Sequence, residues 1–361
     1  MNTLRSILRQ AYPTAWLLEG KECMSQKELC IIFAGTQRQK NYFSYLAYGD
    51  FSSERALGRK WVWNILRPDA KKTAAAIVVI ETALTWPWFF SQRPGFCIPT
   101  WINGRVDLKY GLEQALKTGN VKEDLRRIRK NKLQYEVRRD RKSFSDFYHG
   151  MYVPYMKRTH GNRALLHSYE NLIEKIEQSE LLLIRMGAEI VSGQVLVYQN
   201  GLVRTRELGI KDGDFRFVKA GAAAALYYFG LTYLKDRGFR TVELGGSRAF
   251  LNDGVLQFKK KWGVQLIRSQ PRVFFLRPAQ VTDGVKGFLS NNPFIYLGRQ
   301  GLCGAIFPIE QDRAADGIFS RYQKKYSFEG LKKLNFFRLK DGPRGVEIIT
   351  EDGDLVLQEA K

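Results

Sequence analysis

The stretch that decides the fold runs Glu-Leu-Gly-Gly-Ser-Arg-Ala-Phe-Leu-Asn-Asp-Gly-Val-Leu-Gln-Phe-Lys-Lys-Lys-Trp-Gly, over residues 243–263. Upstream of it, apolar runs separated by turn residues predict three strands, at 181–185, 190–198 and 203–208. A long helix then opens on the small residues 220–225, and a short strand follows at 241–244. The predicted order is therefore strand, strand, strand, helix, strand, with a glycine pair directly after the last strand.

This order resembles the GNAT acyltransferase fold, whose central helix also begins with small residues. The segment Phe-Lys-Lys-Lys-Trp-Gly at 258–263 resembles the Phe-Lys-x-x-(Phe/Trp)-Gly signature of FemAB-like aminoacyltransferases and of related acyltransferases from cell-envelope and polysaccharide clusters. The resemblance covers residues 120–275 well, and residues 1–118 only as a weak second unit. It implies an α/β fold (an α+β mixed sheet) of two tandem GNAT-like units with a C-terminal extension.

The length of 361 residues, with 44% apolar and 13% aromatic content, predicts a folded chain of two domains and a tail. We expect a GNAT-like N-terminal unit at 1–119, the acyltransferase domain at 120–277, and a C-terminal helix plus small β meander at 278–361. Further strands are expected at 29–34, 42–47, 76–80, 96–101 (an edge strand) and 264–276, the last interrupted by Pro271. In the tail we expect a helix around 312–334 and strands at 335–339, 346–350 and 355–358.

The formal charge of +22 attracts polyanions such as RNA, anionic lipid, nucleotide-activated sugars or coenzyme A, and does not choose among them. Residues 121–142 hold ten Lys or Arg against four acids, and predict a basic amphipathic helix with Leu125 and Ile128 on its buried face. Two interpretations stay open. The helix is a solvated face, or residues 122–142 contact RNA or an anionic membrane surface.

The four cysteines and three histidines are widely spread and match no metal-ligand spacing, so we expect no metal and a reducing compartment. The N-terminus lacks the apolar core of a signal peptide. The most hydrophobic window, residues 74–90, is short and polar for a membrane-spanning helix. The expected location is therefore cytoplasmic, with peripheral attachment at the inner face of the membrane as an option.

The resemblance also implies where an acyl donor binds. In GNAT enzymes pantetheine lies in a split between two strands, and the pyrophosphate sits on the N-terminus of the following helix, where free N–H groups and the helix dipole attract anions. The donor is acyl-CoA (acetyl-CoA) or, as in FemAB-like relatives, aminoacyl-tRNA. The candidate donor-binding residues are Arg216, Lys219, Ala220, Gly221, Ala222 and Ala223. The coenzyme A pattern (Gln/Arg)-x-x-Gly-x-(Gly/Ala) is not met, since Val218 precedes Gly221 by three; close helix–sheet packing is the alternative reason for the small residues.

Acyl transfer needs a proton acceptor and stabilisation of an oxyanion. Lys259 occupies the lysine position of the signature, which implies that it neutralises phosphate or a developing oxyanion; the alternative is a solvated run of charges. Glu207 and Glu243, on two predicted strands, are the candidate proton acceptors.

The candidate contacts of the acceptor substrate are Arg248, Asp253 and Tyr152. The leading hypothesis is an acyltransferase that acts on an amine or hydroxyl of a cell-envelope or polysaccharide precursor. The alternative is a non-catalytic basic module of the same fold that binds RNA or an anionic membrane surface.

Overall fold

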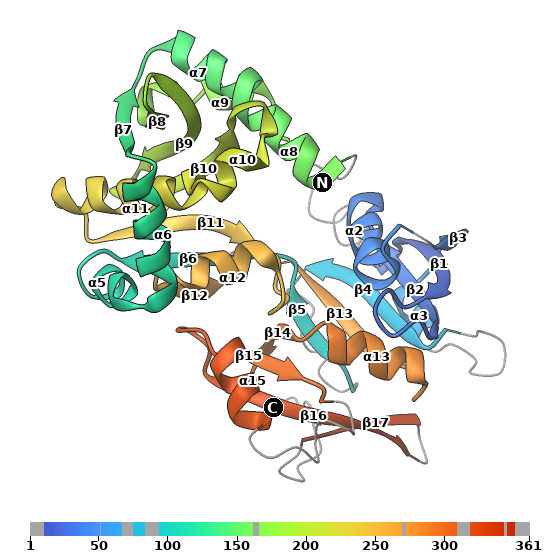
Figure 1. Ribbon diagram of the computed structural model, residues 1–361. Helices are drawn as coiled ribbons and strands as arrows, with labels where there is room; N and C mark the ends of the chain where they lie inside the picture. The colour runs from blue at the N-terminus through green and yellow to red at the C-terminus, as the bar shows by residue number, and fades with distance from the viewer. Residues whose placement is uncertain are drawn as a thin grey trace. The chain divides into compact units, whose positions relative to one another are not determined.

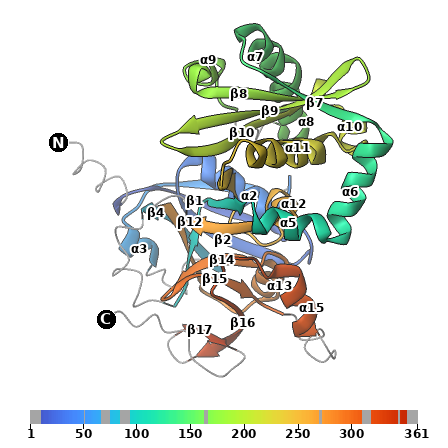
Figure 2. The same ribbon diagram turned by 90° about the vertical axis from the view of Figure 1, so that its left-hand side faces the viewer.

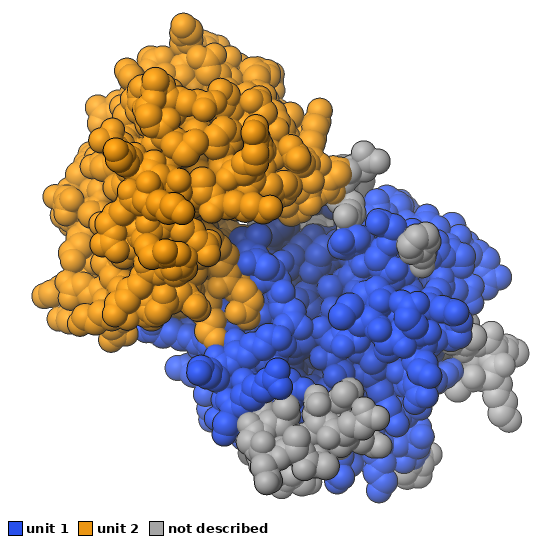
Figure 3. All heavy atoms as spheres, viewed as in Figure 1, with its two compact units in different colours: residues 1–102, 248–256, 268–361 blue, residues 103–247, 257–267 orange. Residues whose placement is uncertain are grey.

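The computed structural model describes residues 11–50, 52–66, 75–83, 94–161, 166–268, 272–308, 318–342 and 345–350. The chain forms two compact units, and each is discontinuous in sequence (Figure 3). Unit 1 comprises residues 1–102, 248–256 and 268–361, and unit 2 comprises residues 103–247 and 257–267. The quoted stretch 243–263 therefore contributes to both units.

The larger sheet of unit 1 has six strands in the described part of the chain: β1 (Thr14–Lys21), β2 (Glu28–Gly35), β3 (Ser53–Arg59), β4 (Ile77–Ala83), β5 (Phe96–Pro99) and β13 (Arg272–Pro278). Their order is β3-β1-β2-β4-β13-β5 (Figure 1). β1 is antiparallel to both β2 and β3, whereas β2 is parallel to β4. Between β2 and β4 the chain passes through α2 (Gln37–Tyr48), β3 and α3 (Val62–Leu66). β4 is an apolar run buried on both faces, as expected for a central strand with a parallel neighbour.

A second sheet of unit 1 contains β14 (Phe294–Gly298), β15 (Gly301–Ile306), β16 (Lys333–Gly342) and β17 (Gly345–Thr350). Two helices, α13 (Asp283–Asn291) and α15 (Ile318–Tyr326), belong to the same part of the chain. Phe96 of the larger sheet packs edge-on against Phe294, Phe307 and Phe337, with ring centroids 5.0, 5.8 and 5.2 Å away. This phenylalanine cluster joins the two sheets of unit 1.

Unit 2 is built on one mixed sheet, which in the described residues has the order β12-β6-β11-β10-β9-β8-β7. Its strands are β6 (Ile102–Asp107), β7 (Leu133–Arg138), β8 (Ser179–Met186), β9 (Glu189–Gln199), β10 (Leu202–Ile210), β11 (Thr241–Ser247) and β12 (Val264–Arg268). β7 to β10 form an antiparallel meander, and β11 then pairs parallel to β10.

The helical segments of unit 2 follow the chain from β6 to β12. They are α5 (Tyr110–Lys117), α6 (Gly119–Lys130), α7 (Arg141–Phe147), the π-helix η1 (Tyr148–Tyr152), α8 (Val153–His160), α9 (Tyr169–Ile173), η3 (Ile176–Gln178), η4 (Lys211–Gly213), α10 (Phe215–Lys219) and α11 (Ala222–Asp236). The last helix, α12 (Gly254–Lys260), begins in unit 1 and ends in unit 2.

Helices cover both faces of the unit 2 sheet. Successive residues of a strand point to opposite faces, so two neighbouring residues of β9 show which helix lies on each face. On β9, a Cβ added to Gly193 would lie 2.7 Å from the Phe147 ring of α7. Its neighbour Ser192 points the other way and donates to the carbonyl of Ala222 in α11 at 3.4 Å. Figure 2 shows α11 running along β9 and β10 on one side of the sheet. The meander is thus buried between α11 and the layer of α7 and η1.

Two expected elements have a different structure. Residues 42–47, expected as a strand, lie in the helix α2, whose N-cap Thr36 accepts a hydrogen bond from the amide of Gln39. The single helix expected over 121–142 ends at Lys130, and an edge strand and a second helix follow it. Lys132, with a φ of +48°, and the N-cap Asp140 separate these elements. Capping and turn geometry outweigh the uniform basic composition here.

Two further expectations differ from the structure. The strand expected at 264–276, with an interruption at Pro271, consists of two strands in different sheets, β12 in unit 2 and β13 in unit 1. The helix expected around 312–334 is α15, which ends at Tyr326 before β16 begins at Lys333. The strand expected at 355–358, and parts of the windows 74–90 and 312–334, lie outside the described residues.

The mixed α/β class with GNAT-like units is confirmed by the strand–helix order. The meander at 181–209, the edge position of β5 and the parallel strand after α11 are as expected. The limits of the compact units differ from 119/120 and 277/278, and the three-part division into functional domains stays a prediction. Among the described helices, none combines the length and the hydropathy that a membrane crossing requires.

Candidate active site

The parallel pairing of β10 and β11 ends early. The two strands pair at Val203–Val242 and Arg204–Glu243, after which β10 continues to Ile210 and β11 to Ser247 without further pairing to each other. α11 follows β10 in the chain, so its N-terminus belongs to this end of the sheet. An early end of pairing between β10 and β11 is the geometry that the resemblance implies for a donor-binding split. That a donor binds there stays a prediction.

A β-bulge lies in β10 at the same level. The register with β9 shifts between Thr205 and Leu208, so Arg206 and Glu207 together face a single residue of β9. Bulges bend a strand and re-aim its side chains, and they are frequent beside active sites. Here the bulge aims the carboxylate of Glu207 inward, and this residue is only 7% exposed.

Glu207 is paired with a histidine from a distant segment. The Nδ1 atom of His167 lies 2.7 Å from Oε1 of Glu207, and the guanidinium of Arg206 lies 3.3 Å from the same oxygen. Burial raises the pKa of the Glu207 carboxyl, but the hydrogen bond with His167 and the charge of Arg206 outweigh it and hold the pKa below its ordinary value. An ionised carboxylate only accepts hydrogen bonds, so the pairing with Glu207 assigns the proton to Nδ1 of His167 and leaves Nε2 as the basic nitrogen. In this tautomer Nη2 of Arg206, 3.3 Å from the same Nδ1, does not donate to it.

The imidazole is reachable, whereas the carboxylate is not. The side chain of His167 is 53% exposed. Oε2 of Glu207 is sealed from solvent and has no hydrogen-bond partner in the described part of the chain. Glu207 is thus placed to orient His167 rather than to take a proton from a substrate itself.

Tyr152 belongs to the same cluster. Its hydroxyl oxygen accepts a hydrogen bond from the backbone N–H of His167 at 3.1 Å. Tyr152 ends the π-helix η1, and π-helical turns are frequent at functional sites. A Cβ added to Gly209 of β10 would lie 2.5 Å from the Tyr152 nitrogen, so glycine lets η1 approach the strand. The side chain of Tyr152 is buried, so the structure places it as a support of His167.

The small residues 220–225 have a specific role at the start of α11. Gly221 is the N-cap and has a φ of +101°, a conformation that L side chains rarely adopt. The carbonyl of Ala220 accepts a hydrogen bond from Asn131, the C-cap of α6, at 2.9 Å. Ala222 is fully buried, and Ala223 is half-buried. The basic last turn of α6 therefore lies beside the N-terminus of α11.

The two cations expected to bind the donor lie just before this helix. Arg216 is exposed, and its guanidinium pairs with Asp214 at 2.6 Å. Lys219 is exposed at the end of α10. The helix α11 begins at Ala222 and not at Ala220, and Gly221 is the N-cap residue that connects α10 to α11. The donor-binding role of these residues stays a prediction.

Lys259 and Trp262 of the signature segment are buried and its other residues are half-buried, and the Phe, Trp and Gly positions each have a structural contact. The ring of Phe258 packs edge-on against Tyr227 at 5.0 Å, and Trp262 stacks on the same tyrosine at 5.9 Å. Gly263 has a φ of +73°, and a Cβ there would lie 2.5 Å from the carbonyl oxygen of Gly111. The segment thus joins α12 and β12 to α11 and to the start of α5.

Lys259 is not part of a solvated run of charges. It is 3% exposed, and its ammonium donates to the carbonyl oxygens of Gly245 and Gly246 at 3.0 Å each and to Oγ of Ser247 at 3.1 Å. Its neighbour Lys261 pairs with Asp124. Its observed contacts hold the end of β11 in place.

Glu243, the second candidate proton acceptor, is fully engaged. Arg105 donates to its Oε1 at 2.9 Å, and Arg204 to its Oε2 at 2.7 Å. Burial raises the pKa of the Glu243 carboxyl, but the hydrogen bonds from the two arginines hold it below its ordinary value. A carboxylate with both oxygens in ion pairs is a poor proton acceptor. The geometry favours a structural role for Glu243.

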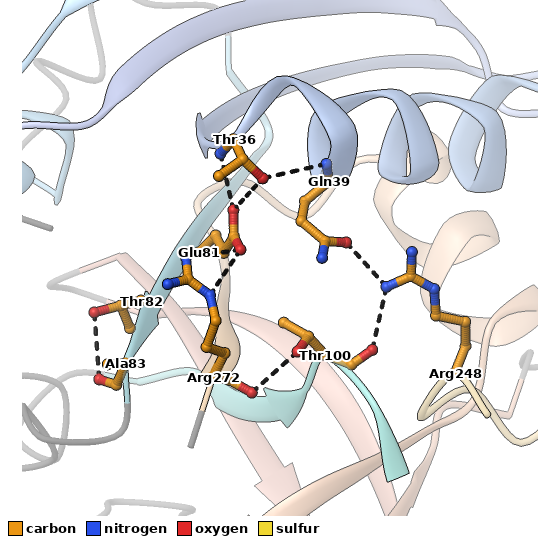
Figure 4. Close-up of polar contacts among 8 residues, drawn as sticks. All are labelled: Thr36, Gln39, Glu81, Thr82, Ala83, Thr100, Arg248 and Arg272. Carbon is orange, nitrogen blue, oxygen red and sulfur yellow. Dashed lines mark hydrogen bonds and ion pairs between the residues drawn. The ribbon is translucent and has the colours of Figure 1, made fainter. Parts of the chain in front are cut away.

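The remaining candidates, Arg248 and Asp253, lie in unit 1. Arg248 is buried beside Gln39 and Thr100 (Figure 4). Oδ1 of Asp253 accepts from the amide of Leu256 at 2.8 Å and so caps the start of α12. Sequence reasoning did not single out His167. The one available signal was that a lone histidine precedes the helix cap Ser168, which is too weak to indicate a site.

No group of His, Cys, Asp and Glu in the described residues is arranged to hold a metal ion. The order of strands and helices in unit 2, with the parallel strand after α11, is that of a GNAT-like fold. Solved structures similar to the chain include FemX, with 13% identity, 73% of this chain and 84% of that chain covered, and a TM-score of 0.38.

Two others are L-PGS from Bacillus licheniformis (12% identity, 74% and 82% covered, TM-score 0.37) and a GCN5-related N-acetyltransferase from Kribbella flavida (10% identity, 81% and 68% covered, TM-score 0.28). Likeness at this level carries no argument about the chemistry of this chain. No protein-family model matches the sequence, and no curated protein is similar enough in sequence to match.

Proposed function

We propose that the chain is an acyltransferase and that unit 2 carries its active site. The observation that carries the proposal is the Glu207–His167 pair on the bulged strand, beside the early end of pairing between β10 and β11. A carboxylate that accepts from Nδ1–H orients the imidazole and leaves Nε2 to take a proton from an attacking amine or hydroxyl. His167 is the catalytic base in this proposal, and Glu207 is a positioning residue.

The donor is an acyl-CoA, such as acetyl-CoA, or an aminoacyl-tRNA. Both carry phosphate, and the N-terminus of a 15-residue helix beside the basic end of α6 favours anions. Arg216, Lys219 and residues 220–223 are the proposed donor contacts. The acceptor is an amine or hydroxyl of a cell-envelope or polysaccharide precursor, and the proposed location is the cytoplasm, with peripheral contact to the membrane.

The test is steady-state acyl transfer with each donor in turn. We expect His167→Ala to lower kcat by about 10²–10⁴-fold, the usual contribution of a general base, and to abolish the acid limb of the pH profile. Glu207→Gln should lower kcat at least about tenfold with little change in KM, because the imidazole loses the carboxylate that orients it.

His149→Ala is the matched control, since His149 is exposed and has only ring contacts with Tyr148 and Tyr169. It should retain wild-type kcat and pH profile. Glu243→Gln should lower stability without moving the acid limb. If His167→Ala transfers acyl groups at the wild-type rate, the assignment of the base is wrong, and if no donor supports transfer, the proposed function fails.

A second candidate function is favoured by the charge of α6. Lys122, Arg129 and Lys130 are exposed and have no carboxylate oxygen within 4.0 Å in the described part of the chain. A basic module that binds RNA or an anionic membrane surface through this helix would need no acyl donor. It predicts binding that depends steeply on salt and is indifferent to the acyl group.

A further inference from the structure

Unit 1 contains a buried arginine without an acidic partner. Arg248 is 7% exposed, and within the described residues no carboxylate oxygen lies within 4.0 Å of its guanidinium. Burying a charge is strongly unfavourable unless an opposite charge or several hydrogen bonds compensate for it. The surroundings of Arg248 therefore need an explanation.

The site is built from α2 and from the segment after β5. Nη1 of Arg248 donates to Oε1 of Gln39 at 2.9 Å and to the carbonyl oxygen of Thr100 at 3.2 Å (Figure 4). The guanidinium carbon lies 3.7 Å from the ring centroid of Tyr42 and 4.2 Å from that of Trp101. Two aromatic rings and two acceptors thus hold the guanidinium in one orientation.

One edge of the guanidinium, formed by Nε and Nη2, has no partner among the described residues. Elsewhere in the described residues, side-chain nitrogens that are sealed from solvent and lack a hydrogen-bond partner include Nε of Arg105 and Nε1 of Trp262. Nε and Nη2 of Arg248 are not in that group, so this edge of the guanidinium retains contact with solvent. Figure 4 shows that only Nη1 is engaged by the residues drawn.

The acids of unit 1 nearest to this site are committed elsewhere. Oε1 of Glu81 accepts from Arg272 at 2.8 Å, and Oε2 accepts from the amide of Thr36 at 2.8 Å and from its hydroxyl (Figure 4). Asp253 caps α12. Burial lowers the pKa of the Arg248 guanidinium. Among the nearby groups Arg38 lowers it further, whereas Tyr42, Asp253 and Glu81 act in the opposite direction.

We propose that Arg248 forms an anion-binding site in unit 1 that takes a two-oxygen anion, a phosphate or a carboxylate, on its Nε–Nη2 edge. A guanidinium edge matches the spacing of two such oxygens, and stacking between rings fixes its plane before the ligand arrives. Assignment of this anion to the acceptor substrate rests on the proposed function; binding of the anion does not.

The experiment uses the full chain without any acyl donor. Binding of inorganic phosphate, inorganic pyrophosphate and malonate is measured by thermal shift and calorimetry, with chloride added to equal ionic strength as the reference. We expect saturable stabilisation by at least one of the three. A preference for the phosphates or for malonate identifies the source of the oxygens. No stabilisation beyond that of chloride would overturn the proposal.

Arg248→Lys is the decisive variant, because it keeps the charge and loses the flat two-nitrogen edge. It should weaken anion binding at least tenfold, and Arg248→Gln more. The control Arg338→Gln removes one exposed positive charge of β16 in the same unit and should bind like the wild type. Equal affinity of Arg248→Lys and the wild type would overturn the proposal.

If both Arg248 variants fail to fold, the site is tested by anomalous diffraction from wild-type crystals soaked in tungstate, an oxyanion whose heavy atom can be located directly. A tungstate within hydrogen-bond reach of Nε and Nη2 supports the site, and no tungstate there overturns it. The two proposals fail separately. Anion binding without acyl transfer contradicts only the proposed function, and acyl transfer without anion binding contradicts only the site in unit 1.

Discussion

At the residue scale, the contacts of Lys259 indicate what this residue of the signature segment does in the fold. Three hydrogen bonds from its ammonium satisfy acceptors at the end of β11, including two carbonyl oxygens that follow the last pairing with β10. A lysine in this position fixes the backbone that borders the split. The role that the resemblance implies, neutralising an oxyanion, would require its ammonium to turn away from these acceptors.

We expect Lys259→Met to lower the free energy of unfolding by roughly 2–4 kcal/mol, because buried acceptors lose a charged donor. Acyl transfer should fall at least about tenfold, equivalent to about 1.4 kcal/mol of transition-state stabilisation. Urea unfolding measures the first effect, and steady-state kinetics on the folded variant measure the second.

Lys260→Met is the control for this prediction. Lys260 is half-buried and precedes the turn into β12, so its loss should reduce stability and activity less. A larger loss of activity in Lys260→Met would show that Lys259 is not the signature lysine. A loss of stability without any loss of activity in Lys259→Met would leave it a purely structural residue.

At the scale of elements, the composition of residues 121–142 predicts a charge pattern but not where the helix ends. α6 buries Val121, Asp124 and Ile128 and presents its cations on the other side. Arg126 and Arg127 share Glu123, at 2.9 and 3.3 Å. The charge available to a polyanion is therefore smaller than the sequence count suggests.

If α6 contacts a nucleic acid, replacing Arg126, Arg127 and Arg129 together with Gln should weaken binding. The slope of log affinity against log salt should flatten by roughly 0.7–0.9 for each lost phosphate contact. Fluorescence anisotropy with transfer RNA at several salt concentrations measures both quantities. A coenzyme A donor predicts almost no change.

The matched control replaces Lys332, Arg338 and Lys340, three exposed cations at the start of and along β16, with Gln. Its charge change equals that of the α6 triple variant. Equal loss of binding in the two variants would indicate attraction by net charge alone. Unchanged affinity and slope in the α6 variant would return the helix to a solvated face.

At the scale of the whole molecule, three buried glutamates and the half-buried Glu136 link stability to pH. For Glu136, Glu180, Glu207 and Glu243, burial raises the pKa, but hydrogen bonds and charges from arginine, tyrosine or histidine outweigh it and lower the pKa below its ordinary value of 4.5. Glu180, for example, accepts from Tyr233 at 2.9 Å and from Arg237 at 2.8 Å. All four lie in unit 2.

A lowered pKa in the folded state means that, as the pH falls, these carboxylates bind protons in the unfolded chain at a higher pH than in the folded chain. The contribution of these carboxylates to stability is therefore fully present above pH 4.5 and is lost as the pH falls through their lowered values. We expect the free energy of unfolding, measured by urea titration between pH 7 and pH 3, to decline below this point.

Glu180→Gln should lower stability at pH 7 by about 2–3 kcal/mol and make the acid decline shallower. Glu177→Gln, which changes an exposed glutamate of η3, should change neither the stability at pH 7 nor the steepness of the acid decline. A decline of equal steepness in Glu180→Gln and the wild type would contradict the linkage.

The sequence by itself determined the local elements of unit 2. The meander followed from alternating apolar residues and from turns that need positive φ, observed at Gly187, Asn200 and Gly201. These are short-range preferences of the backbone, so they can be read without knowing the fold. The α11 helix and the parallel strand after it followed in the same way.

Only the tertiary structure decided the chemistry. The partners His167 and Glu207 are 40 residues apart, and Glu243 lies in ion pairs with arginines from two other strands. Which carboxylate is free to orient a base, which lysine is buried and which arginine lacks an acid depend on burial and on neighbours from distant segments. Those quantities exist only once the chain has folded, because a charge is tuned by what surrounds it in space.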